Sequence, residues 1–485
     1  MEPTAAAEPT ATATAGPGYA EAEIGFESLD EEVRIDDVPV EGALPEWLRG
    51  SLIRTGPAKF EVGEQRMRHW FDGLAMLYRF GFADGRVSYA NRFLGSKAKR
   101  TADERGEIAY AEFATDPCRS LFKRMFSVFS PQLSDNANVN LVELGERFVA
   151  MTETPIPVQF DPETLATAGV AWEVPGELTT AHPHLDRDSG GMLNYAAKLG
   201  PRNRYRFFLL GPDGAEPEIR ASLPTREPAY MHSFGLTERW IVLAEFPFVV
   251  NPLQLALAGR PYIENYRWKP ELGTRFTLVD RSSGEATGPF TTDACFGFHH
   301  VNAYEDDDGR VVADICTFED PEVIESLYLD RLRQGAPIPK PSLTRFVIDP
   351  EGGGIDYEQL VPDGLDLPRI NYGRCNERPY RYVWGAGLAP GEGGGFFDRI
   401  VAVDIEERAT RSWHEPHCYP GEPVFVAEPG AEEENQGVLL SVVLDAAAGT
   451  SFLLVLDASD LSEIARARAP HHIPFGFHGQ FSRRA

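Results

Sequence analysis

Cysteine is scarce in this chain of 485 residues. There are five, and no two of them have the Cys-x-x-Cys spacing: Cys118, Cys295, Cys316, Cys375 and Cys418. An odd number without paired spacing argues against a disulfide framework and against a structural zinc knuckle. A reducing compartment suits such a chain, and we expect a cytoplasmic protein.

Positive charge is also scarce. The 46 Lys and Arg residues face 74 Asp and Glu residues, which gives a formal net charge of −28. An acidic surface repels phosphate backbones, so we expect no nucleic-acid partner. Only 7 of the 46 basic residues are lysine, a bias that favours a bacterial or archaeal source.

Long hydrophobic runs are missing. No stretch contains the roughly 20 consecutive apolar residues that a membrane-spanning helix needs. Residues 1–20 are rich in Ala, Thr, Pro and Glu and contain neither the basic region nor the apolar core of a signal peptide, so we expect a disordered leader there. No linker-like composition interrupts the remainder, and we expect residues 21–485 to form a single domain.

What the chain does contain is a series of short apolar or alternating runs bounded by Gly, Pro, Asp or Asn. They predict strands over residues 204–210, 240–246, 275–280, 310–318, 344–348, 399–405, 437–444 and 451–456. The last two are separated by a short turn-forming segment and predict a hairpin. With 45 Gly and 38 Pro available for tight turns, this pattern predicts an all-β fold, either a propeller or a large sandwich.

Three segments break the β pattern. Asp116 and Pro117 cap a predicted helix over residues 118–129. Asp320 and Pro321 open a second predicted helix over 322–334, which Gly335 ends. The third segment, residues 246–262, is apolar and interrupted by proline. We expect these segments to be insertions over one face of the β body.

Four histidines lie in apolar or turn-bounded settings: His182, His232, His299 and His478. The last lies in an aromatic-rich C-terminal stretch, which predicts that the end of the chain is buried. An isolated histidine of this kind is more often a hydrogen-bonded core residue than a metal ligand, and no pair has the i, i+4 spacing of a helical metal motif. The wide gaps between the four suit ligands carried on separate blades around a common axis, but spacing leaves both interpretations open.

The other histidines give weaker signals. His69, His184, His471 and His472 are interpreted as structural or surface residues. The segment His414-Glu415-Pro416-His417-Cys418 imitates a metal motif, and we interpret it as a solvated loop.

The residues around the four histidines decide between the two interpretations. The motifs are Thr180-Ala181-His182-Pro183, His232-Ser233-Phe234-Gly235-Leu236-Thr237, Phe298-His299-His300-Val301-Asn302 and Gly476-Phe477-His478-Gly479. Together with 50–57, 69–73, 134–140, 152–154, 371–372 and 422–426, they make the chain resemble the carotenoid cleavage oxygenase family over nearly everything after residue 30. The resemblance implies a seven-bladed β-propeller with helical and loop insertions capping one face. It also implies a ferrous ion, Fe(2+), held by the four histidines, with His300 as a neighbour that points elsewhere.

The resemblance further implies three carboxylates that orient the imidazoles. Four neutral imidazoles suit Fe(II), and an octahedral ion would keep two positions open for O2 and substrate. Outer carboxylates would accept the remaining ring N–H groups, and the family pattern assigns this role to Glu153, Asp366 and Glu422. Asp366 stands where the family usually has glutamate. Because aspartate is shorter by one methylene, we expect its contact to be longer than the others or bridged by water.

The family resemblance also predicts the reaction. Residues 71–77, 116–118 and 152–154 resemble most the branch that contains animal β-carotene 15,15′-oxygenase and the retinoid isomerase of the eye. We therefore expect oxidative cleavage of a carotenoid or apocarotenoid double bond to aldehydes, with a β-carotene-type substrate giving retinal. Cleavage of stilbenes, isomerohydrolysis of retinyl esters and a metal-free binding platform are the alternatives.

Such a lipophilic substrate must come from a membrane or a lipid carrier. Residues 117–130 predict an amphipathic face with the apolar residues Leu121, Phe122, Met125, Phe126 and Phe129 and the basic residues Arg119, Lys123 and Arg124. A basic amphipathic patch suits anionic headgroups, and the apolar segment 246–262 could lie beside it. The alternative is that both segments pack against the propeller as ordinary core.

Overall fold

The computed structural model describes residues 22–116, 133–200, 202–214, 216–257, 260–362, 364–389 and 395–485. The leader expected over residues 1–20 and the helix expected over 118–129 lie outside the described residues. The predicted membrane face at 117–130 lies outside them as well.

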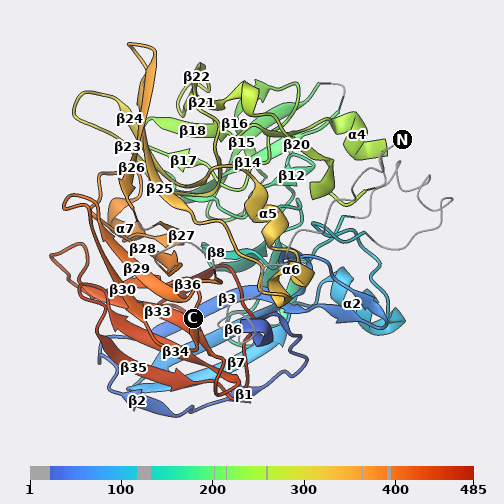
Figure 1. Cartoon of the computed structure of the whole chain (residues 1–485), viewed down its shortest axis with the longest axis vertical. Helices are drawn as coiled ribbons and strands as arrows, with labels where there is room; N and C mark the ends of the chain where they lie inside the picture. Colours follow the sequence, from blue (N-terminus) through green and yellow to red (C-terminus); the bar gives the residue numbers. More distant parts are fainter. Residues whose placement is uncertain are drawn as a thin grey trace, which may run out of the picture.

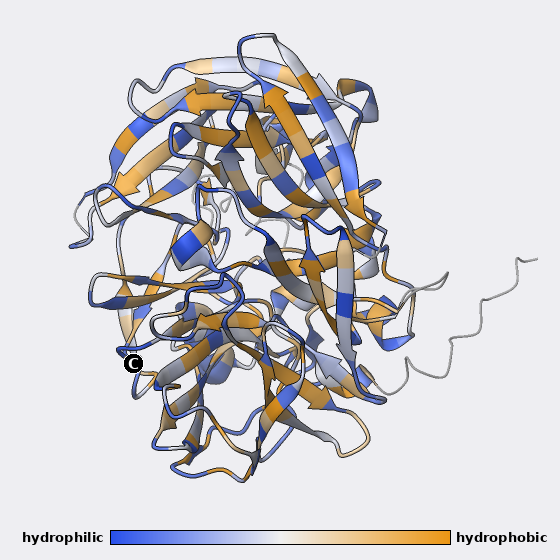
Figure 2. Ribbon diagram, turned by 90° about the vertical axis from the view of Figure 1, so that its left-hand side faces the viewer, coloured by the Kyte–Doolittle hydropathy of each residue, from blue (hydrophilic) through white to orange (hydrophobic). Residues whose placement is uncertain are grey.

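The described chain forms a seven-bladed β-propeller, as the family resemblance implied (Figure 1). Each blade is an antiparallel sheet of four to six strands. In Figure 2 hydrophobic and hydrophilic residues alternate along many of the strands. Successive side chains of a strand point to opposite faces of its sheet. In β6 (Leu74–Ala83) both faces are buried, with Tyr78 and Leu77 in different core clusters, so a blade packs against a neighbour on each side.

Five blades are each built from one continuous segment of the chain, although β19 (Phe248–Val250) and β20 (Tyr266–Trp268), which lie within the segment of the fourth blade, form a separate hairpin. The second blade contains β8 (Asn140–Leu144), β9 (Arg147–Met151), β10 (Val158–Phe160) and β11 (Thr167–Val170). The third contains β12 (Leu178–Thr179), β13 (His184–Asp186), β14 (Gly191–Lys198), β15 (Arg204–Leu210) and β16 (Glu218–Pro224). The fourth contains β17 (Gly235–Leu236), β18 (Trp240–Glu245), β21 (Thr274–Asp280) and β22 (Ala286–Thr292). The fifth contains β23 (Phe296–Glu305), β24 (Val311–Phe318), β25 (Ser342–Asp349) and β26 (Gly354–Val361), and the sixth contains β27 (Leu365–Arg369), β28 (Tyr382–Gly387), β29 (Arg399–Asp404) and β30 (Ala409–His414).

The first and seventh blades are each built from both ends of the chain. The first contains β1 (Arg34–Ile35), β3 (Gly50–Lys59), β6 (Leu74–Ala83), β7 (Arg86–Phe93) and the C-terminal strand β36 (Gly479–Ser482). The seventh contains β31 (Cys418–Pro420), β32 (Val424–Ala427), β33 (Gly437–Asp445), β34 (Thr450–Asp457), β35 (Glu463–Arg468) and the N-terminal strand β2 (Val40–Gly42). Leu52 of β3 pairs with Phe481 of β36, and Val40 of β2 pairs with Ala467 of β35. Strands from the two ends of the chain therefore pair in two blades and close the circle of blades. The C-terminal segment that carries His478 is held in place by this pairing.

The remaining elements are short. Two further hairpins are formed by β4 (Glu61–Val62) with β5 (Gln65–Arg66) and by β19 (Phe248–Val250) with β20 (Tyr266–Trp268). The helices are α2 (Lys97–Arg105), α4 (Pro252–Leu257), α5 (Glu322–Ser326), α6 (Leu329–Arg333) and α7 (Tyr372–Cys375), with the 3₁₀ turns η1 (Glu23–Phe26), η2 (Trp70–Asp72), η3 (Ile263–Asn265) and η4 (Pro270–Leu272).

The predicted strands are confirmed, including the hairpin of β33 and β34, in which Asp445 pairs with Thr450. The prediction of a single helix over 322–334 is wrong. Tyr328 adopts an extended conformation and forms a β-bridge with His69, and the Leu329 amide donates to the Arg68 carbonyl oxygen at 2.9 Å. These bonds to another segment interrupt the helical ladder and divide the segment into α5 and α6.

The apolar segment 246–262 lies partly in the core. Phe246, Phe248 and Val250 are buried, whereas Leu253 of α4 is 73% exposed. The first part of the segment therefore packs in the core, as the alternative interpretation expected. In the described part of the segment, Leu253 is the one strongly exposed apolar side chain. Within the described residues, no helix has the length and apolar character needed to cross a membrane.

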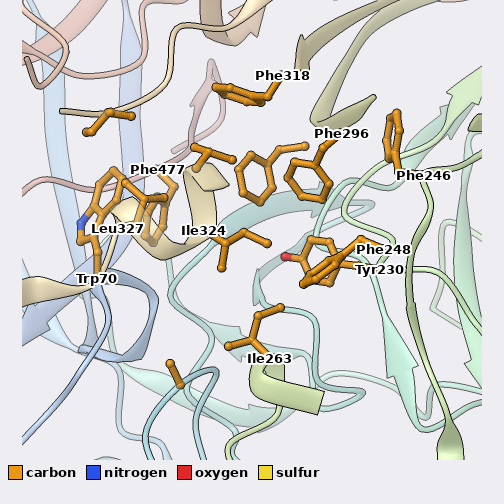
Figure 3. Close-up of a cluster of buried hydrophobic side chains, with 14 of the residues drawn as sticks. Trp70, Tyr230, Phe246, Phe248, Ile263, Phe296, Phe318, Ile324, Leu327 and Phe477 are labelled. Carbon is orange, nitrogen blue, oxygen red and sulfur yellow. The ribbon is translucent and has the colours of Figure 1, made fainter. Parts of the chain in front are cut away.

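A large aromatic cluster lies where the insertions meet the fourth and fifth blades. Buried rings from η2, β18, β19, β23 and the C-terminal segment pack with Ile324 and Leu327 from the α5–α6 region. Figure 3 shows these two aliphatic side chains among the rings, and Figure 1 shows α5 and α6 crossing the middle of the molecule. The insertions therefore form an apolar layer over one side of the propeller centre.

Candidate metal centre

The four predicted histidines come from four blades and meet at the propeller centre. His182 lies between β12 and β13, His232 precedes β17, His299 lies within β23, and His478 immediately precedes β36. One ring nitrogen from each lies within 4.8 Å of the corresponding nitrogen of every other. The long intervals between the four histidines in the sequence therefore reflect their positions on different blades.

The Nε2 atoms face one another. The Nε2 atoms of His182 and His232 are 3.0 Å apart, and those of His299 and His478 are 3.1 Å apart. His232, His299 and His478 are at most 7% exposed, and His182 is partly buried.

Three carboxylates hold the opposite ring nitrogens. The Nδ1 of His232 donates to Glu153 Oε1 at 2.7 Å, that of His299 to Asp366 Oδ1 at 2.6 Å, and that of His478 to Glu422 Oε1 at 2.7 Å. Each contact places a ring hydrogen on Nδ1 and leaves the Nε2 lone pair directed at the centre. His182 has no carboxylate partner among the described residues.

Burial favours the neutral form of three of these imidazoles. It lowers the pKa of His182 well below the ordinary value, and the other three histidines add to the effect. It also lowers the pKa of His232, and it lowers that of His478 to about 4, although Glu153 and Glu422 respectively act in the opposite direction. Neutral imidazole is the form that binds a metal ion.

The donor set fits a divalent transition metal. If His299 and His478 both carry their hydrogen on Nδ1, no hydrogen is left between their two Nε2 atoms, and the facing lone pairs repel. A cation between them removes that repulsion. Adjacent nitrogens at about 2.1 Å from an octahedral ion would lie about 3.0 Å apart, as these pairs do.

Comparison with known proteins gives the family. The family model described as "Retinal pigment epithelial membrane protein" matches residues 26–483. The chain is 33% identical to the "Carotenoid-cleaving dioxygenase, mitochondrial" of Mustela putorius furo, over 94% of this chain and 95% of that protein. It is 32% identical to the "Beta,beta-carotene 15,15'-dioxygenase" of Homo sapiens, over 91% of each. The chain belongs to the carotenoid cleavage oxygenase family.

Solved structures from this family have the same fold. The chain matches a cobalt-substituted Synechocystis ACO with a TM-score of 0.86 and 27% identity, over 95% of this chain and 98% of that one. It matches an ACO/RPE65 chimera with a TM-score of 0.84 and 27% identity over the same shares.

The expectation of a long or water-bridged contact at Asp366 is wrong. Its 2.6 Å bond to His299 is as short as the two glutamate contacts. The backbone compensates for the shorter side chain, because the β27–β28 register shifts between Asp366 and Arg369 and Leu367 adopts a left-handed φ of 51°. This bulge re-aims the aspartate toward the centre.

We therefore expect Asp366→Asn to weaken metal retention as much as Glu153→Gln does. Loss of an outer partner typically costs about 10–100-fold in metal affinity or activity, and both carboxylates make direct contacts of nearly equal length. Metal content and turnover of the two variants, prepared in parallel, measure the effect. A clearly milder Asp366→Asn would show that the direct contact contributes little.

His300 points away from the four ligands. Its Nδ1 lies 2.8 Å from Ser233 Oγ, and its amide donates to the same oxygen at 2.9 Å. His69 and His184 are internal structural residues, since their Nε2 atoms reach the carbonyl oxygens of Ile324 and Phe234 at 3.0 and 2.8 Å. His414 is exposed at the end of β30 and contacts the Asp398 carbonyl oxygen.

Three supporting residues escaped the sequence analysis. Tyr230 donates to Glu153 Oε1 at 2.6 Å. Arg369 pairs with both oxygens of Glu422 at 2.8 and 3.1 Å, and Arg54 donates to the Glu422 and Phe477 carbonyl oxygens. Proximity in sequence was the available signal for two of them, because Tyr230 precedes a ligand by two residues and Arg369 follows Asp366 by three. For Arg54 the signal was its place in the motif at 50–57.

Proposed function

We propose that the chain is an Fe(II)-dependent dioxygenase that uses O2 to cleave a carbon–carbon double bond of a carotenoid or apocarotenoid into aldehydes. A β-carotene-type substrate, with retinal as the product, is the expected case. One observation carries the proposal: His299 and His478 direct two bare Nε2 lone pairs at each other across 3.1 Å while carboxylates hold both Nδ1 atoms. That arrangement supports a bound cation, and the dioxygenase activity for which the relatives are named supports its use.

Iron bound there would supply open coordination positions at which O2 and the double bond can react. The protein itself positions the metal ligands and excludes water from the substrate. The three carboxylates fix the imidazole orientations, and the aromatic cluster offers the flat, water-excluding surface that a conjugated polyene needs. The rings of Phe298 and His232 lie 5.3 Å apart, so this surface begins next to a ligand.

Product analysis tests the proposal. The purified, iron-loaded protein is incubated with β-carotene and with apocarotenals under isotopically labelled O2, and the products are analysed by mass. We expect aldehydes that carry the label. A hydrolysed and isomerised retinyl ester without label would instead support an isomerohydrolase, and cleavage of a stilbene alone would support the stilbene reaction.

We also propose that the protein works in the cytoplasm at a membrane surface. The support is the sequence of residues 117–130 and the 73% exposed Leu253. Burying one large apolar side chain contributes about 1.5–3 kcal/mol, so the double change Phe122→Ser and Phe126→Ser should release most protein from anionic liposomes. Flotation and a thermal melt are measured together. Lost flotation with an unchanged melt supports the membrane face, whereas persistent binding or a collapsed melt contradicts it.

A further inference from the structure

A pair of tyrosine hydroxyl groups lies inside the aromatic cluster. The Tyr262 and Tyr266 hydroxyl oxygens are 2.6 Å apart. Two hydroxyl groups carry two hydrogens, and one of them occupies the bond between the oxygens. The described residues provide no acceptor for the second hydrogen, so the pair keeps one unused donor.

This pair is joined to the metal centre by two routes of contacting rings. On one side, the Tyr266 ring lies 5.7 Å from that of Tyr230, whose hydroxyl bonds Glu153 behind His232. Figure 3 shows Tyr230 among the apolar side chains of the cluster.

On the other side, a row of rings leads from the C-terminal ligand to the pair. Phe477, beside His478, lies 5.0 Å from Phe71, and Phe71 lies 5.1 Å from Phe113. Phe113 in turn lies 6.1 Å from Tyr262. Phe71, Phe113 and Tyr262 are only partly buried, although their rings pack together. The row therefore connects the metal centre to the hydroxyl pair through three rings that retain some accessible surface.

Tyr262 is the member of the pair that can meet a ligand. Tyr266 is 3% exposed, whereas Tyr262 is partly accessible. Burial raises the pKa of both phenols, and the negative charge of Glu153 contributes to the rise. Both hydroxyl groups therefore stay protonated near neutral pH.

We propose that Tyr262 determines substrate specificity by donating a hydrogen bond to an oxygen atom on the end of the polyene. The oxygen belongs to an aldehyde, ketone or hydroxyl group, so among β-carotene-type substrates the site favours an oxygen-bearing one, such as an apocarotenal, over the hydrocarbon of the same length. A hydrocarbon packed against the row would cover the donor without an acceptor, and a buried polar group left unpaired opposes binding. A site built to hydrogen-bond a substrate discriminates against the analogue that lacks the polar group more strongly than an apolar site discriminates by size. This inference rests on the proposed function.

The test compares two substrates of equal chain length, one a hydrocarbon and one with a terminal carbonyl or hydroxyl group. The native protein should cleave the oxygen-bearing substrate at least about fivefold more efficiently in kcat/KM, the size of one hydrogen bond. Tyr262→Phe should remove this preference by raising KM for the oxygen-bearing substrate and should leave the hydrocarbon nearly unaffected. Tyr266→Phe should keep most of the preference, because Tyr262 retains its own hydroxyl group. Tyr328→Phe is the matched control, since this tyrosine packs against the same cluster without joining the pair.

Binding of both molecules under anaerobic conditions, followed by tryptophan fluorescence, provides a second measure on the native protein and does not depend on how the variants fold. It should show the same preference. Equal affinity and equal cleavage of the two substrates, or a Tyr262→Phe change that affects both equally, would overturn the assignment of Tyr262 while leaving the proposed function intact. Cleavage of neither substrate by the iron-loaded native protein would overturn both.

Discussion

Replacement of His232, His299 or His478 by alanine is expected to remove most bound iron and to lower cleavage activity by at least about 100-fold. The four Nε2 atoms converge from four blades within 4.8 Å, and the described residues contribute no other acidic or cysteine ligand to this group. Losing one ligand removes a metal bond and also leaves an outer carboxylate buried without its imidazole, so the loss should exceed the roughly 10–100-fold typical of an outer-partner change. His182→Ala should do the same through the metal bond alone, because His182 has no carboxylate partner in the described chain.

The control is the neighbouring histidine. His300 is next to a ligand in sequence and is partly buried, but its ring bonds Ser233. His300→Ala should therefore keep its iron, whatever it costs in stability. Metal analysis of the five alanine variants shows which of the five histidines bind iron. Iron retained by His299→Ala and lost by His300→Ala would reverse the ligand assignment.

Glu422→Gln is expected to have the second largest effect, because it should affect both stability and metal retention. Glu422 is fully buried and accepts from His478 Nδ1, from Arg369 and from the Gly479 amide at 2.8 Å. Burial alone would raise the pKa of this carboxyl, but Arg369, His478 and Arg54 lower it well below its ordinary value. A glutamine amide group has one acceptor oxygen for these donors and leaves Arg369 without a carboxylate. Breaking such a pair costs roughly 3 kcal/mol, in addition to the loss of metal affinity.

Glu415→Gln is the matched control for this change. Glu415 also pairs with an arginine, Arg466, at 2.8 Å, but its side chain is 40% exposed. Exposed pairs contribute about 0–1 kcal/mol, so its melting temperature and iron content should stay close to native. A Glu422→Gln protein that melts and binds iron like the Glu415→Gln protein would show that the buried network does not support the centre.

The ligands could be predicted because each lies in a local motif. His478 in Gly-Phe-His-Gly and His299 in Phe-His-His-Val-Asn resemble the family pattern residue by residue. Their convergence could not be derived from the sequence itself, because it depends on how blades pack around the axis. The blade count was equally hidden: the strands range from the two residues of β12 to the ten of β3, which leaves no regular period.

The finer errors had local physical causes. The Asp366 contact length depends on a bulge at Leu367, and a left-handed leucine has no sequence signal. Arg369 could not be assigned to Glu422 because the two side chains come from different blades. The interruption between α5 and α6 depends on the bridge between Tyr328 and His69, which joins segments far apart in the chain.

The most direct test of the central claim is the metal content of the protein purified without oxygen or chelators, measured together with its cleavage activity on a carotenoid. The arrangement of His182, His232, His299 and His478 predicts close to one iron per chain, and activity that is lost on chelation and restored by ferrous iron. A preparation that cleaves carotenoids without bound metal, or that binds iron equally well after His232→Ala, would contradict the account.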